Sequence, residues 1–95
     1  MDIVSSGNHV VIEGNIKSVG DYQSIKETLD ALTKNQKTVR VTIKDSISIT
    51  SSIIGYLTKL VQKEGVELSI EVGDSSLYEL FDDLNLVTLF KIKKA

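Results

Sequence analysis

The sequence predicts an α/β fold, in which a mostly parallel, mixed β-sheet of four to five strands carries helices packed mainly on one face. Segments of alternating or β-branched apolar residues take turns along the chain with segments whose apolar residues recur at helical spacing. Strand–helix–strand alternation favours a parallel sheet with right-handed helical crossovers. Because the chain contains only three such helical segments, we expect them to cover a single face.

The first elements are a hairpin and a helix. Residues 10–12 form a β-branched strand, and residues 3–4 are expected to pair with it across a turn at residues 5–8, which contains a glycine and an asparagine. A helix is then predicted from Asp21, its N-cap, to Asn35, its C-terminal stop. Its apolar residues are spaced by 3, 4 and 3 positions and share one helical face: Tyr22, Ile25, Leu29 and Leu32.

A central strand and a second helix follow. Residues 38–45 alternate apolar and polar side chains, which is typical of a half-buried strand. Residues 51–64 read as a helix with Thr50 or Ser51 as its N-cap and Gly65 as its left-handed stop. The apolar stripe of this helix comprises Ile53, Leu57, Leu60 and Val61.

The last elements are two strands and a short helix between them. Residues 66–72 alternate again, and Asp74 is well placed to cap the helix that comes next. A terminal strand is expected over residues 89–92. The apolar face of the short helix is predicted to comprise Leu77, Leu80, Phe81 and Leu84.

Composition limits the classes of function. The 95 residues are expected to form a single domain, 1–95, without cysteine and with a net charge of -2, which gives no basic footprint for nucleic acid. No apolar stretch approaches the roughly 20 residues that cross a bilayer, so we expect no direct membrane insertion. The first residues lack the basic start and long apolar core of a signal peptide, and a cytoplasmic location is the expectation.

The sequence lacks the common motifs of catalytic sites. It has no glycine-rich phosphate loop and no nucleophile elbow, and the single histidine, His9, has neither a cysteine nor a second histidine to complete a site. We therefore expect no catalytic residues, no metal site and no cofactor. The chain is predicted not to be an enzyme.

Hydroxyl side chains crowd the start of the second predicted helix. Five of the seven positions from 46 to 52 carry one: Ser46, Ser48, Thr50, Ser51 and Ser52. Capping accounts for one hydroxyl, and ordinary loop solvation could account for the others. The alternative is a covalent switch, because a serine at a helix N-terminus can accept a phosphate without unravelling the helix.

The chain resembles the STAS domain, the family named for sulfate transporters and anti-sigma factor antagonists. "VVIEGNIKS" is similar to the first strand pair of the family, "VRVTIKDSISITSSIIGYLTKL" to its core strand and switch helix, "EGVELSIEV" to the next strand, and "LYELFDDLNLVTLFKI" to the closing helix and strand. The additional C-terminal helix of many members has no counterpart. By this resemblance Thr50 stands at the usual aspartate, Ser51 at the phosphorylated serine and Ser52 at the serine after it. Ile53 replaces a family glycine, whereas Gly55 matches one.

The resemblance implies a non-catalytic regulatory protein of the anti-sigma factor antagonist type. Its partners would be a partner-switching serine kinase or anti-sigma factor and a PP2C-type phosphatase, with control by phosphorylation near Ser51, and with Ser52 and Thr50 as neighbouring candidates. The predicted partner-binding residues are Ser48, Thr50, Ser51, Gly55, Lys59 and Gln62. An alternative is a structural STAS subunit that docks on an ABC transporter ATPase without phosphorylation. An exposed edge strand could also support a homodimer.

Overall fold

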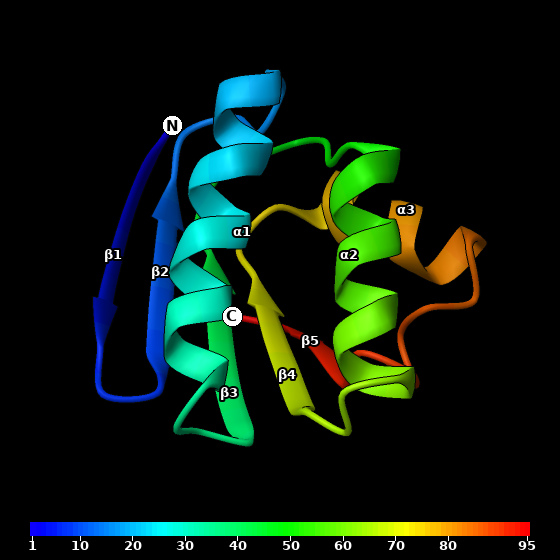
Figure 1. Cartoon of the computed structure of the whole chain (residues 1–95). Coiled ribbons are helices and arrows are strands. Elements are labelled where there is room, and N and C mark those ends of the chain that lie inside the picture. Colours follow the sequence, from blue (N-terminus) through cyan, green and yellow to red (C-terminus); the bar gives the residue numbers. More distant parts are fainter.

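A computed structural model describes residues 1–95 and contains one five-stranded sheet in the order β1-β2-β3-β4-β5 (Figure 1). The strands are β1 (Asp2–Ser6), β2 (His9–Glu13), β3 (Thr38–Ile43), β4 (Glu67–Val72) and β5 (Ile92–Lys94). β1 is antiparallel to β2, and the other neighbours are parallel. The predicted α/β class, with its N-terminal hairpin at one edge of a mixed sheet, is confirmed.

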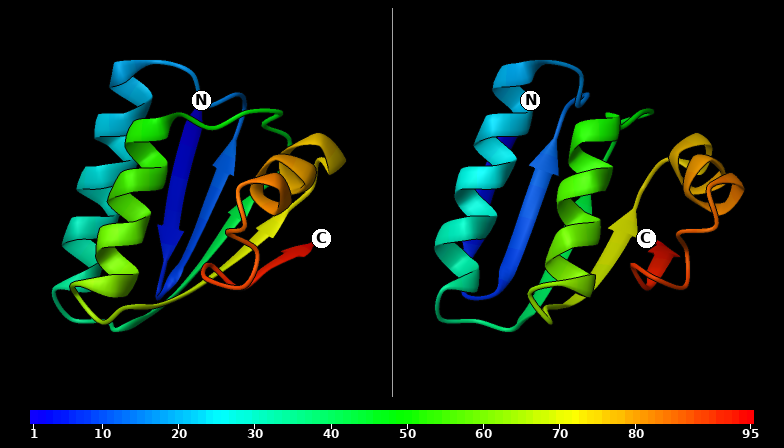
Figure 2. Two further views of the ribbon diagram at one scale, coloured as in Figure 1. Left: turned by 90° about the vertical axis from the view of Figure 1, so that its right-hand side faces the viewer. Right: turned by 45° about the vertical axis from the view of Figure 1, so that its right-hand side comes forward.

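Three helices lie on one face of this sheet (Figures 1 and 2): α1 (Val19–Thr33), α2 (Ser51–Gln62) and α3 (Ser75–Asp83). The strand order follows the chain order without reversal, so right-handed crossovers bring every helix to the same side. Burial agrees, because Val39, Val41 and Ile43 of β3 are buried whereas Arg40 between them is exposed. The helices thus cover one face and leave the other open.

The core lies between the sheet and the helices. Twenty buried apolar side chains form one cluster, so the single predicted domain has a single core. The ring of Phe81, on α3, meets the ring of Phe90 edge to face, with the two centroids 6.1 Å apart. Leu84, which was predicted to share the apolar face of this helix, is instead 47% exposed because it lies just beyond the last turn.

The prediction for the ends of α1 was wrong. Ser18, in an extended conformation, is the N-cap, and its Oγ accepts the N–H of Asp21 at 3.0 Å. Asp21 lies one turn inside the helix, where its carboxylate accepts the N–H of Ser18 at 3.2 Å and closes a capping box. At the other end the helix stops at Thr33, ahead of the predicted stop at Asn35.

The terminal strand also differs from the prediction. β5 begins at Ile92 instead of residue 89, because the preceding segment is a turn in which the Ile92 N–H donates to the Val87 carbonyl at 2.9 Å. This turn directs the Phe90 side chain into the core, where it is completely buried. The predicted stops and caps elsewhere are confirmed: Gly65 has a φ of +67°, and the Asp74 carboxylate accepts the N–H of Ser76 at 2.8 Å.

Candidate functional site

The β2–α1 and β3–α2 loops interlock at the carboxyl edge of the parallel strands. Side chains of each loop accept backbone N–H groups of the other: Asp45 from Gly14 at 2.7 Å, Ser46 from Ile16 at 3.0 Å, and Asn15 from Ile47 at 3.1 Å. Behind them, a Cβ added to Gly73 would stand 2.0 Å from the Lys44 carbonyl oxygen. These bonds and this close approach hold the start of α2 in one position over the sheet.

Three of the five clustered hydroxyls have structural tasks. Ser46 is completely buried, and it donates to the Ser48 carbonyl at 2.7 Å while accepting from the neighbouring loop. The Ser48 hydroxyl is exposed and lies 3.5 Å from the Ile16 carbonyl. Thr50 is the N-cap of α2 and accepts the Ile53 N–H at 3.3 Å. Capping and loop bridging therefore explain most of the cluster.

The other two hydroxyls of the cluster, those of Ser51 and Ser52, have no such structural role. Both side chains are exposed in the first turn of α2, and neither makes a hydrogen bond within the chain. Their backbone N–H groups also have no acceptor in the chain, as is usual for the first turn of a helix. That turn contains no acidic residue, so the positive end of the helix dipole is not balanced by a neighbouring carboxylate. This end of α2 can accept a negative charge.

The predicted contact residues of α2 lie on its outer surface. Ser51, Gly55, Lys59 and Gln62 are all exposed. A Cβ added to Gly55 would meet no atom within 4 Å, so the backbone is open to approach from outside. Thr50 differs from this group, because it is half-buried and engaged in capping.

Farther along α2 the structure has a groove that the sequence did not reveal. It is a hollow of about 400 Å³ between the carboxyl-terminal halves of α1 and α2. Its lining consists of Lys26, Asp30, Thr33, Lys34, Lys37, Tyr56, Lys59, Leu60 and Glu64. Of these residues, only Lys59 belongs to the predicted site.

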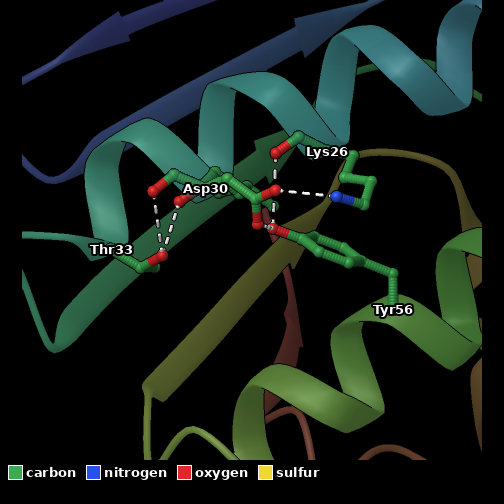
Figure 3. Close-up of polar contacts among 5 residues, drawn as sticks. Lys26, Asp30, Thr33 and Tyr56 are labelled. Carbon is green, nitrogen blue, oxygen red and sulfur yellow. Dashed lines mark hydrogen bonds and ion pairs between the residues drawn. The ribbon is translucent and has the colours of Figure 1, made fainter.

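Tyr56 connects the two helices at this groove (Figure 3). Its hydroxyl donates to Asp30 Oδ1 at 2.5 Å, and Lys26 Nζ donates to the other carboxylate oxygen at 2.8 Å. A buried tyrosine needs a partner for its hydroxyl, and the position of Tyr56 three residues after buried Ile53 was the available signal. The identity of the partner, 26 residues away, depends on how the helices pack.

The same contacts set the protonation of the pair. Hydrogen bonds from Lys26 and Tyr56 hold the pKa of Asp30 below its ordinary value of 3.8. Burial, followed by the Asp30 carboxylate, raises the pKa of Tyr56. The phenol therefore remains a donor, and the carboxylate remains charged, throughout the neutral range.

The open face of the sheet carries a row of polar contacts. His9 Nε2 lies 2.8 Å from Thr42 Oγ1, and Arg40 Nη2 lies 3.2 Å from His9 Nδ1. Arg40 also approaches Glu71 of the next strand at 3.9 Å. His9 is thus held by its strand neighbours, and no group of three histidine, cysteine or acidic side chains is arranged to hold a metal ion.

Comparisons with known proteins leave the family open. No protein-family model matches the chain. No curated protein matches it at a significant level. None of the three helices combines the length and apolar character that a bilayer-crossing helix requires.

Proposed function

We propose that this protein is a non-catalytic regulatory module of the anti-sigma factor antagonist type, which binds a protein partner through α2 and is controlled by phosphorylation of Ser51. One observation carries the proposal. Ser51, like Ser52 beside it, presents an exposed hydroxyl without a hydrogen bond in a first helical turn that has no acidic residue, whereas Ser46, Ser48 and Thr50 nearby have structural roles. Of these two serines, the resemblance of the segment to the STAS switch helix favours Ser51.

The unmodified protein binds its partner along the exposed line of α2. Ser51, Gly55 and Lys59 contribute to that surface, and the absence of a side chain at Gly55 allows the partner to approach the helix closely. The partner would be a serine kinase of the partner-switching type or an anti-sigma factor. Such a kinase would also be the enzyme that modifies Ser51.

Phosphorylation releases the partner without unfolding α2. A phosphate on Ser51 brings between one and a half and roughly two negative charges to the surface. The free N–H groups of Ser51 and Ser52 and the helix dipole favour this charge, so the helix keeps its conformation. The bound partner, in contrast, meets a bulky anion at the edge of its contact surface. A PP2C-type phosphatase would restore binding.

The test is incubation with the cognate serine kinase and ATP, followed by mapping of phosphate by mass spectrometry. We expect phosphate on Ser51 and none in the Ser51→Ala variant. Ser51→Asp is expected to weaken partner binding by about tenfold or more, which corresponds to about 1.4 kcal/mol. Phosphate confined to other residues, or full partner affinity in Ser51→Asp, would contradict the proposal.

A matched control is available at α3. Ser75 is also the exposed first residue of a helix, and it follows the capping residue Asp74. Ser75→Asp adds the same charge at the first position of another helix, outside the predicted contact residues of α2. It should leave the affinity for the partner unchanged.

The second candidate is a permanent subunit of a transport assembly that docks on an ABC transporter ATPase. The observation that favours it is the role of Thr50, whose hydroxyl is engaged as the helix cap at the position where the STAS pattern has an aspartate. Under this alternative α2 is a constant contact surface. Co-purification with a membrane complex, together with absence of phosphate on Ser51, would support it over the first proposal.

A further inference from the structure

The groove between α1 and α2 concentrates positive charge on an otherwise acidic chain. Four lysines and two acidic residues line it, while the whole chain has a net charge of -2. Lys26 is paired with Asp30 at 2.8 Å. The other three, Lys34, Lys37 and Lys59, are exposed and form no ion pair. The rim of the groove therefore carries three ammonium groups outside any ion pair against one exposed carboxylate, that of Glu64.

The floor of the groove is different from its rim. Leu60 is buried and Tyr56 is 7% exposed. Each therefore presents only a small part of its side chain to the hollow. The Asp30 carboxylate lies between Tyr56 and Lys26, where it is held as an anion (Figure 3). The last turns of α1 and α2, whose free carbonyl groups carry partial negative charge, also end near this groove.

These features argue against a compact polyanion as the ligand. A phosphate group at the floor would meet the Asp30 carboxylate and the negative ends of two helices. An extended acidic segment avoids this repulsion, because its carboxylates can stay at the rim while an apolar side chain reaches the floor. The rim lysines also come from separate segments, the α1–β3 connection and α2, and so suit spaced charges.

We propose that the groove is a docking surface for an acidic peptide segment of a partner protein. Carboxylates of that segment pair with Lys34, Lys37 and Lys59, and an apolar side chain between them contacts Leu60 and Tyr56. This deepens the proposed function and rests on it for the regulatory nature of the partner, since Lys59 belongs both to the groove and to the exposed line of α2 that begins at Ser51.

The test uses the unmodified full chain, labelled with ¹⁵N, and a synthetic peptide in which single leucines alternate with pairs of glutamates. Titration at low ionic strength is followed by NMR. We expect shifts of the backbone amides in the second halves of α1 and α2 and in residues 34–37. Changing Lys34, Lys37 and Lys59 together to glutamate should weaken peptide binding by about tenfold or more. The same three positions changed to glutamine should weaken it less.

A second triple variant is the matched control. Lys17, Lys91 and Lys93 are also exposed lysines without ion pairs, and they lie outside the groove. Their change to glutamate alters the net charge equally and should leave the shifts within the groove in place. A peptide in which leucine is replaced by glutamine should bind more weakly, because the apolar contact is lost.

Three outcomes of the peptide titrations would overturn the inference: no binding, shifts centred away from the groove, or equal weakening by both triple variants. Tripolyphosphate is added as a competitor in a separate titration. Tighter binding of this compact anion to the groove would also overturn the inference. Because no kinase takes part, failure of this test leaves the phosphorylation of Ser51 standing, and failure at Ser51 leaves peptide binding standing.

Discussion

The two ends of α2 are built differently. At the amino end, backbone and short polar side chains of two loops bond to one another, and Thr50 caps the helix. Toward the carboxyl end, Tyr56 connects α2 to α1 through contacts of its hydroxyl with the Asp30 carboxylate and the Lys26 carbonyl, and lysines surround it. The amino end thus depends on close backbone geometry, whereas the carboxyl end depends on side chains and charge.

This difference suits the two proposed roles. A surface that gains a covalent phosphate must keep its shape when its charge changes, and a network of hydrogen bonds between short side chains and backbone N–H groups provides that constancy. A surface that binds a flexible acidic segment needs accessible charge more than a fixed backbone. Substitutions at the amino end should therefore affect stability most, and those at the carboxyl end should affect binding most.

The largest effect is expected at Gly73, behind the amino end. In Gly73→Ala the new Cβ would stand 2.0 Å from the Lys44 carbonyl oxygen, so the backbone must shift. We expect a loss of about 3 kcal/mol in the free energy of unfolding, measured by urea denaturation. The control is Gly55→Ala, where the added Cβ meets nothing within 4 Å and should stabilise α2 by about 0.5–1 kcal/mol. Equal stability of the two variants would contradict the tight packing of the loops.

The next effect is expected at Ser46. Ser46→Ala removes a completely buried hydroxyl that accepts from the Ile16 N–H and donates to the Ser48 carbonyl. Both groups would be left without this partner, which should cost about 2 kcal/mol. Ser52→Ala, which removes an exposed hydroxyl without a hydrogen bond, should change the free energy of unfolding by less than about 0.5 kcal/mol. A comparable loss in both variants would mean that Ser46 does not bridge the loops.

A smaller effect is expected at the carboxyl end. Tyr56→Phe keeps the ring but removes the hydroxyl that donates to Asp30. Because the Asp30 side chain is 44% exposed and water can replace the lost donor, we expect a cost of only about 1 kcal/mol. A double-mutant cycle with Asp30→Asn measures the coupling between the two helices. Strictly additive effects in this cycle would show that the contact does not link them.

The smallest effect is a dependence on pH. The folded-state pKa of Asp30 lies below its ordinary value of 3.8, so its contribution to stability is present above that pH and is lost as the pH falls through the folded-state pKa. The stability difference between the wild type and Asp30→Asn should therefore be constant near neutrality and shrink below pH 3.8. Urea titrations at a series of acidic pH values measure it. A difference that grows on acidification would contradict the assignment.

Local patterns predicted much of the fold. The hairpin, the three helices and the alternating strands follow from the spacing of apolar residues, which depends on each element separately. The errors occurred where two local solutions compete. Both Ser18 and Asp21 are good caps, and the extended conformation of Ser18 decided between them. At residues 89–92 the apolar pattern suits a strand, but burial of Phe90 against Phe81 requires a turn.

The candidate site was also predicted only in part from the sequence. From the sequence alone came the position of the hydroxyl cluster at the start of a helix, because capping and helical periodicity are local properties. Only the tertiary structure separated Ser46, which bridges two loops, from Ser51, which forms no hydrogen bond, because the Ile16 N–H that donates to Ser46 lies 30 residues away in the chain. The groove, with Tyr56 facing Asp30 across two helices, likewise exists only after α1 and α2 pack side by side on the sheet.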